Sequence, residues 1–139
     1  MILLDTNVVS ELMRREPELT VVRWLDAQPA TSVWISSITV LEIEFGLLTL
    51  PESRRRELMK AAFKQILQEK IDWRVAPFDK EAGFHAAGLM AARISDGRSG
   101  DMRDTMIAGI VVSTGAIFAT RNTSHFADLP GKVINPWKP

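Results

Sequence analysis

Three acidic side chains in this sequence stand beside apolar residues, where a charge needs an explanation. Asp5 ends a short apolar run, Glu42 lies inside a nearly uninterrupted apolar segment, and Asp104 precedes a segment of small and apolar residues. Burying a charge is costly unless the charge is paired or bound to a metal. Carboxylates that share a pocket raise one another's pKa, and a hard divalent cation such as Mg²⁺, which prefers oxygen ligands, removes that penalty. The pattern favours metal-assisted chemistry on a phosphate or phosphodiester.

Each of these acids also has a purely structural interpretation. Asp5 could bond nearby backbone amides at the end of a strand. Asp101 and Asp104 stand three residues apart at the start of a predicted helix, where the helix dipole favours negative charge and both could act as capping acids. Glu42 could face solvent, and periodicity does not separate it from Glu44 because their helix is apolar on nearly all sides.

The composition excludes several other kinds of protein. The 139 residues suffice for one domain, and 46% hydrophobic with 24% charged residues is ordinary globular usage. Seventeen basic and seventeen acidic residues give a net charge of zero, so a nucleic acid would have to meet a local basic patch. Without cysteine there is no thiolate metal site or cysteine nucleophile, and two histidines leave little for a His-rich zinc site.

The sequence predicts neither a signal peptide nor a membrane span. The first residues include no basic region and only a short apolar run before Asp5. No stretch approaches the roughly 18 apolar residues that a transmembrane helix requires. We therefore expect a cytoplasmic protein.

Apolar runs typical of strands alternate with segments typical of helices, which predicts an α/β fold around a parallel sheet. The expected strands are 2–4, 32–35, 73–75, 116–120 and 132–134, and the expected helices are 8–14, 18–26, 38–48, 52–70, 79–93 and 101–113, with a loop at 95–100. Function in such folds gathers beyond the carboxyl ends of the strands, where the strand order reverses. The first strand delivers Asp5 and Asn7 to that edge, and the fourth delivers Thr120, Arg121 and Asn122. If these two strands are neighbours, the site lies between them.

Several segments, in order along the whole chain, resemble the PIN-domain ribonucleases of the VapC type, and most closely the FitB-like branch. Each motif is weak alone, but their order over the full length is specific. The matching segments are MILLDTNVVSE at 1–11, SITVLEI at 37–43, DTMIA at 104–108, ATRNTSHF at 119–126 and NPW at 135–137.

This resemblance implies a single PIN domain over residues 1–139, built as a three-layer α/β/α sandwich with a five-stranded parallel sheet. It also implies an Mg²⁺-dependent endoribonuclease, with Mn²⁺ as a substitute, that acts as the toxin of a type II toxin–antitoxin system. Transfer RNA is a common substrate in this family. The implied partners are an RNA substrate, a cognate antitoxin and a second copy of the chain in a homodimer, and the apolar helix ending near residues 47–50 agrees with self-association.

The resemblance assigns the acidic triad to Asp5, Glu42 and Asp104. Asp5 and Asp104 would be the principal metal ligands, and Glu42 would complete the pocket or orient the attacking water. Asn122 stands where the family often has a fourth acid; its carbonyl can ligate a metal but brings no charge. Asp101, one turn before Asp104, is a further candidate ligand.

Other polar residues have both a functional and a structural interpretation. Thr6 and Asn7 could tune Asp5 or make ordinary turn bonds, and Thr120 could bind substrate phosphate or a water molecule. Arg121 could contact phosphate or face solvent. A basic stripe could follow the RNA backbone or form a solvated helix face; its members, at helical spacing, are Arg56, Lys60 and Lys64.

Two other functions remain open from the sequence. A haloacid-dehalogenase-like phosphatase would use Asp5 as nucleophile, but that chemistry needs a second aspartate two residues later, where this chain has Asn7. The stronger alternative is a catalytically impaired PIN-like RNA-binding module, because Asn122 departs from the acidic pattern.

Overall fold

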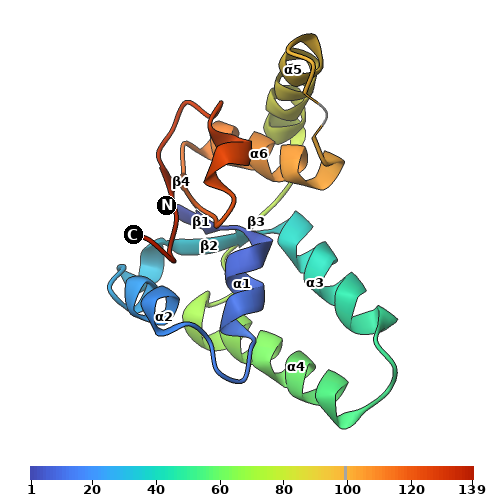
Figure 1. The fold of residues 1–139 in the computed structure, drawn as a ribbon, viewed down its shortest axis with the longest axis vertical. Coiled ribbons are helices and arrows are strands. Elements are labelled where there is room, and N and C mark those ends of the chain that lie inside the picture. The colour runs from blue at the N-terminus through green and yellow to red at the C-terminus, as the bar shows by residue number, and fades with distance from the viewer. Residues whose placement is uncertain (99) are drawn as a thin grey trace.

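The computed structural model describes residues 1–98 and 100–139. Its core is a five-stranded sheet in the order β3-β2-β1-β4-β5, with every neighbouring pair parallel (Figure 1). The short apolar runs form strands because both faces of this sheet are covered. The strands are β1 (Ile2–Leu4), β2 (Val33–Ser36), β3 (Val75–Ala76), β4 (Ile117–Ala119) and β5 (Val133–Ile134).

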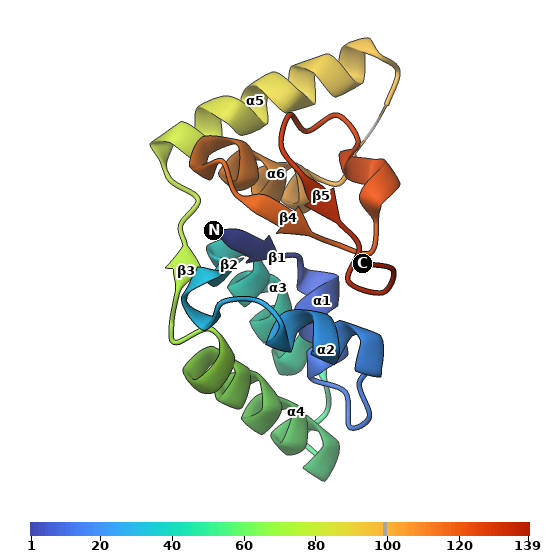
Figure 2. The same ribbon diagram turned by 90° about the vertical axis from the view of Figure 1, so that its left-hand side faces the viewer.

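Helices cover both faces of the sheet, so the molecule has three layers (Figure 2). The first four helices lie on one face, where they bury one apolar cluster with Ile2 and Leu4, while α5 and α6 pack around Leu3 and Phe118 on the other. The bounds are α1 (Thr6–Leu12), α2 (Leu19–Asp26), α3 (Ser37–Thr49), α4 (Arg54–Gln65), α5 (Lys80–Ser95) and α6 (Met102–Thr114), with 3₁₀ turns at Ala30–Ser32 and Thr123–Phe126.

The predicted α/β/α sandwich with five parallel strands is confirmed, and β1 and β4 are neighbours as the predicted site required. Strand order reverses between them, because β2 continues the sheet on one side of β1 and β4 on the other. The predicted loop at 95–100 begins one residue later than expected, since α5 reaches Ser95, and its residue 99 lies outside the described part.

Two predicted elements were wrong in part, whereas the other predicted strands and helices agree with the structure within two residues at each end. The helix expected over 52–70 gives way after Gln65 to a π-helical turn, Ile66–Lys70, which turns Ile66 and Leu67 into the core. The strand expected at 73–75 starts only at Val75, because Trp73 adopts a left-handed backbone conformation with φ of 58°. Neither departure affects the sheet edge that carries the site. Across the described residues, no helix is long and apolar enough to cross a membrane.

Helices α5 and α6 approach one another closely at Gly109. A Cβ placed there would lie 2.5 Å from the Ala82 carbonyl oxygen and 2.8 Å from the Ala86 Cβ. Because the clash is with backbone, we expect Gly109→Ala to lower the free energy of unfolding by about 1–3 kcal/mol, measured by urea denaturation.

The matched control for that substitution is Gly88→Ala on α5, where a Cβ meets no atom within 4 Å. Alanine is the better helix former, so this variant should gain up to about 1 kcal/mol. Equal effects of the two substitutions would contradict the close approach of α5 and α6.

Candidate active site

A pocket of about 560 Å³ opens where β1 and β4 end side by side. It brings together residues from five separate parts of the chain. Of the residues predicted from the sequence, it is lined by Asp5, Thr6, Asn7, Glu42, Asp104, Arg121 and Asn122, and it also contains Ser10, Glu11, Arg14 and Trp137.

Asp5 is at once a helix cap and a pocket carboxylate. Its Oδ1 accepts a hydrogen bond from the Thr6 backbone N–H at 2.8 Å, which starts α1, and its Oδ2 accepts one from the Thr120 hydroxyl at 2.7 Å. Only 4% of the residue is exposed. Burial raises the pKa of Asp5 from an ordinary 3.8 to about 6, against the lowering effect of these hydrogen bonds, and the charges of Asp104 and Glu42 raise it further.

Thr120 joins the two strand ends through its fully buried hydroxyl group. While donating to Asp5, this hydroxyl accepts from the Asn7 side-chain amide at 3.4 Å and from the Asn122 backbone N–H at 3.0 Å. Asn7 in turn accepts a hydrogen bond from the Arg121 backbone N–H at 3.4 Å. The loop after β4 is therefore fixed against Asp5.

A chain of hydroxyl groups holds Glu42 toward the pocket. The Thr6 hydroxyl donates to Glu42 Oε1 at 2.9 Å and lies 2.9 Å from the Thr39 hydroxyl, to which Ser36 donates at 3.2 Å. Glu44 is exposed on the same helix and does not line the pocket. The structure thus selects Glu42 over Glu44, a choice that periodicity left open.

Asp104 contributes the third carboxylate from the first turn of α6. Its pKa is raised by burial first and by the neighbouring charge of Asp101 second, while His125, Arg103 and Arg93 lower it. Asp101 itself caps α6 by accepting the backbone N–H of Arg103 at 2.7 Å. It lines a second hollow of about 300 Å³, which shares Asp104 with the main pocket.

The donor set suits a hard divalent cation. All candidate ligands offer oxygen, and the pKa of both aspartates is raised, chiefly by burial, so each carboxylate is costly to keep charged without a cation. Within residues 1–98 and 100–139, no three His, Cys, Asp or Glu side chains form a ready-made metal cage. Mg²⁺ does not require one, because it commonly takes one or two protein carboxylates and keeps several waters or substrate phosphate oxygens.

The predicted basic stripe lies away from this pocket. Arg56, Lys60 and Lys64 belong to α4, and none of them lines either hollow at the sheet edge. Arg56 is half-buried, and its Nη1 donates to the Leu50 carbonyl at 3.4 Å.

Several residues of the site were missed by sequence reasoning. Ser36 and Thr39 complete the hydroxyl chain to Glu42, and a signal was available because both precede Glu42 on one polar strand-to-helix junction. Glu11 is buried in the pocket wall, where it pairs with Arg14 at 3.2 Å and accepts the Glu18 backbone N–H. The three-residue spacing of Glu11 and Arg14 was the signal for that pair.

Comparisons with known proteins agree with this geometry. The PIN domain family model matches residues 2–132. The chain is 40% identical to the VapC ribonuclease Y4jK of Sinorhizobium fredii, over 100% of this chain and 99% of that protein. It is 32% identical to Toxin FitB of Neisseria gonorrhoeae, over 99% of both chains.

Two solved structures share the fold. The crystal structure of FitAcB from Neisseria gonorrhoeae superposes with a TM-score of 0.87 at 32% identity, covering 99% of each chain. DNA-bound VapBC from Salmonella typhimurium gives 0.81 at 26% identity, covering 97% of each chain. With its sheet order, its acidic pocket and these matches in agreement, the chain belongs to the PIN-domain family, within the group of VapC and FitB proteins.

Proposed function

We propose that this protein is a metal-dependent endoribonuclease and the toxin of a type II toxin–antitoxin system. The observation that carries the proposal is the gathering of Asp5, Glu42 and Asp104 in one pocket, with the pKa of both aspartates raised. The relatives named VapC ribonuclease and Toxin FitB support the activity and the toxin role.

Asp5 and Asp104 would hold an Mg²⁺ ion, or Mn²⁺ in its place, with Asn122 offering a neutral carbonyl at the pocket edge. When bound, such an ion makes water acidic enough to attack at neutral pH and stabilises in-line displacement at phosphorus. Thr120 keeps the Asp5 carboxylate in one orientation. Glu42, fixed by Thr6, orients the attacking water by accepting its hydrogen bond. In this proposal Asp101 is a helix cap that adds negative charge near Asp104 and is not itself a metal ligand.

The proposed partners follow from the same family membership. RNA is the substrate, with transfer RNA as the first class to test, and an antitoxin protein is the inhibitor. We also propose a homodimer in the cytoplasm, and the α3 surface supports self-association, because three large apolar side chains at helical spacing are exposed on it: Leu41, Phe45 and Leu48.

The test of this function is cleavage of total cellular RNA by the purified chain, followed by sequencing of the new RNA ends. EDTA should stop cleavage, and added Mg²⁺ or Mn²⁺ should restore it at the same positions. Metal-independent RNA binding without strand scission would instead favour an impaired RNA-binding module, and a phosphoenzyme on Asp5 would favour a phosphatase.

A further inference from the structure

The arginines in the pocket and beside it differ in whether a carboxylate already engages them. Arg14 pairs with Glu11 at 3.2 Å, and Arg103 lies 3.9 Å from both Glu42 and Asp101. Arg121 lines the same pocket, and among the residues that the structure describes no carboxylate oxygen lies within 4.0 Å of its guanidinium nitrogens. Its charge is therefore available to an anion.

Arg121 is held in place although it is exposed. Its guanidinium carbon lies 4.9 Å from the centroid of the Trp137 ring, which is a cation–π contact. Its backbone N–H donates to Asn7, so both ends of the residue are fixed at the pocket rim. The guanidinium N–H groups make no hydrogen bond to another described residue, so they remain available as donors.

Trp137 is itself anchored, which makes it a firm support. Its backbone N–H donates to the Asn135 side chain at 2.9 Å, and its ring packs against the apolar cluster beneath α1 and α2. The C-terminal segment thus carries an aromatic ring to the rim of the acidic pocket, next to the loop after β4.

We propose that Arg121, positioned by Trp137, binds a backbone phosphate of the RNA strand next to the phosphodiester at the acidic centre. The inference rests on the proposed function and deepens it by naming where the strand lies. An acidic pocket repels a phosphodiester, and a planar guanidinium with free donors is well suited to binding one. Arg121 is the group that contacts the substrate, and Trp137 is a positioning residue.

The experiment measures equilibrium binding of a fluorescent single-stranded RNA oligonucleotide in EDTA over a range of salt concentrations. Arg121→Ala should weaken binding roughly tenfold and reduce the slope of log Kd against log salt by about 0.7, the value for one lost phosphate contact on a single strand. Arg121→Lys should keep the slope and lose part of the affinity, because it retains the charge without the fork.

The role of Trp137 is tested by a double-mutant cycle. Trp137→Leu should weaken binding about two- to fivefold, and Trp137→Phe should restore most of it, since a ring remains under the guanidinium. In the Arg121→Ala background, Trp137→Leu should cause no further loss. A loss of equal size in both backgrounds would show that the tryptophan acts only through the fold and would overturn its positioning role.

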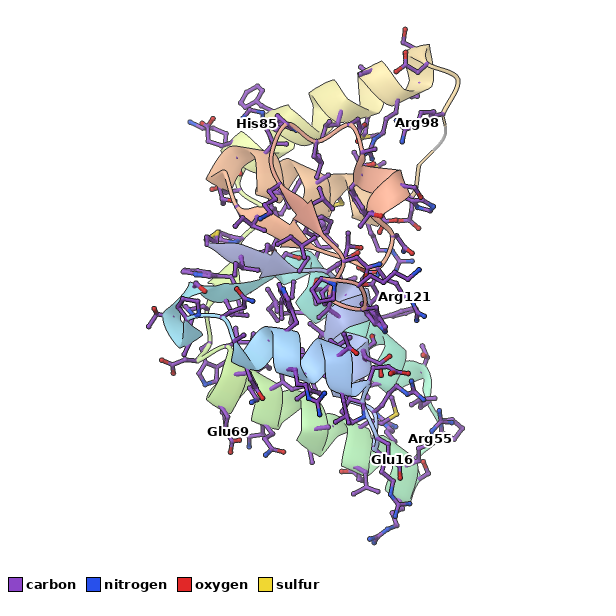
Figure 3. All side chains as sticks on the ribbon, turned by 60° about the vertical axis from the view of Figure 1, so that its left-hand side comes forward. Glu16, Arg55, Glu69, His85, Arg98 and Arg121 are labelled. Atoms are coloured by element: carbon purple, nitrogen blue, oxygen red, sulfur yellow. The ribbon has the colours of Figure 1, made fainter. Side chains whose placement is uncertain are left out.

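Arg55→Ala is the matched charge control. Arg55 is an exposed arginine on α4 that lines neither hollow at the sheet edge, and Figure 3 shows it in the lower part of the molecule, apart from Arg121 near the middle. An equal change in affinity and slope for Arg55→Ala and Arg121→Ala would overturn the inference, because binding would then report general charge or the α4 face.

Cleavage kinetics with Mg²⁺ separate this inference from the proposed function. Arg121→Ala should raise KM much more than it lowers kcat. If Arg121→Ala cleaves RNA normally with an unchanged KM, the phosphate contact is refuted and the nuclease proposal is not affected. If Arg121→Ala loses RNA binding but the wild-type chain cleaves RNA under no metal condition, the phosphate contact stands and the nuclease proposal is refuted.

Discussion

Asp5→Asn is expected to reduce RNA cleavage on the order of a thousandfold while the protein remains folded and becomes more stable at neutral pH. Asparagine keeps the shape of the side chain and an oxygen that can accept the Thr6 backbone N–H, so α1 still starts at the same residue. It removes the charge that would hold a divalent cation. The activity and the stability of this protein therefore respond in opposite directions to one change.

The stability gain follows from the raised pKa of Asp5, which is about 6 in the folded protein against an ordinary 3.8. Between about pH 4 and pH 6, the Asp5 carboxyl group is protonated in the folded state and ionised in the unfolded state. The contribution of Asp5 to the free energy of unfolding is therefore fully present below about pH 4, and it is lost as the pH rises through 6. At pH 7 the charged group costs on the order of 2–3 kcal/mol, and we expect the asparagine variant to recover about 1–2 kcal/mol of it.

Thermal denaturation of the metal-free proteins at pH 4 and pH 7 measures this effect. The melting temperature of Asp5→Asn should exceed that of the wild type at pH 7, and the difference should shrink toward pH 4. Added Mg²⁺ should stabilise the wild-type chain and leave the variant unchanged, because only a bound ion shifts the folding equilibrium. A variant that cleaves RNA at the wild-type rate would refute the metal-ligand assignment of Asp5.

Glu42→Gln and Glu44→Gln form a matched control pair on α3. Both remove one negative charge from the same helix, but only Glu42 receives the Thr6 hydroxyl bond and lines the pocket. Cleavage should fall in Glu42→Gln and stay unchanged in Glu44→Gln.

Much of this architecture was predictable because strand-end chemistry is local in sequence. Asp5 follows its apolar run directly, and Thr120 follows another, so parallel pairing of the two runs was enough to bring them together. The structural and the functional interpretations of Asp5 are not alternatives, however. One carboxylate oxygen caps α1 while the other points to Thr120, so the residue is a cap and a pocket acid together.

What could not be predicted depends on contacts between distant segments. Helical periodicity alone does not distinguish Glu42 from Glu44; the resemblance of residues 37–43 to the PIN family pointed to Glu42, and the contact that holds it comes from Thr6, which is 36 residues away. The π-helical turn after Gln65 and the positive φ of Trp73 arise where the chain must bury Ile71 and still enter β3. The distance of the α4 basic stripe from the pocket likewise depends on the layer into which α4 packs.

The contacts of Arg93 are the clearest case of contacts that could not be predicted from the sequence. Substitution of Arg93 is also expected to have the second large effect. The sequence placed it at the end of a helix, but the structure buries it to 5% exposure. Its Nε and Nη2 donate to Asp128 at 2.8 and 3.0 Å, and its Nη1 donates to the Thr105 hydroxyl at 3.1 Å. These hydrogen bonds therefore join α5 to α6 and to the segment after β4, and Arg93 lines the same hollow as Asp104.

Arg93→Met should lower the free energy of unfolding by about 2–4 kcal/mol at neutral pH. Methionine replaces part of the packing, but the buried Thr105 hydroxyl loses its Arg93 donor, and the Asp128 carboxylate, whose side chain is 25% exposed, loses two charge-assisted hydrogen bonds. Urea denaturation at fixed ionic strength measures the difference.

Arg98→Met is the matched control, because Arg98 contacts the same carboxylate at 3.7 Å but is 43% exposed. Solvent screens that pair, so the control should change stability by less than about 0.5 kcal/mol. Similar losses in the two variants would mean that the buried hydrogen bonds of Arg93 add nothing beyond its charge.

The pH dependence gives an independent check on the Arg93–Asp128 pair. The hydrogen bond from Arg93 holds the pKa of Asp128 below its ordinary value, so the pair stabilises the fold above the unfolded-state pKa. This contribution is lost as pH falls through the lowered pKa of Asp128 and the carboxylate is protonated. The stability gap between the wild type and Arg93→Met should therefore narrow in acid, whereas a gap caused only by lost packing would stay constant with pH.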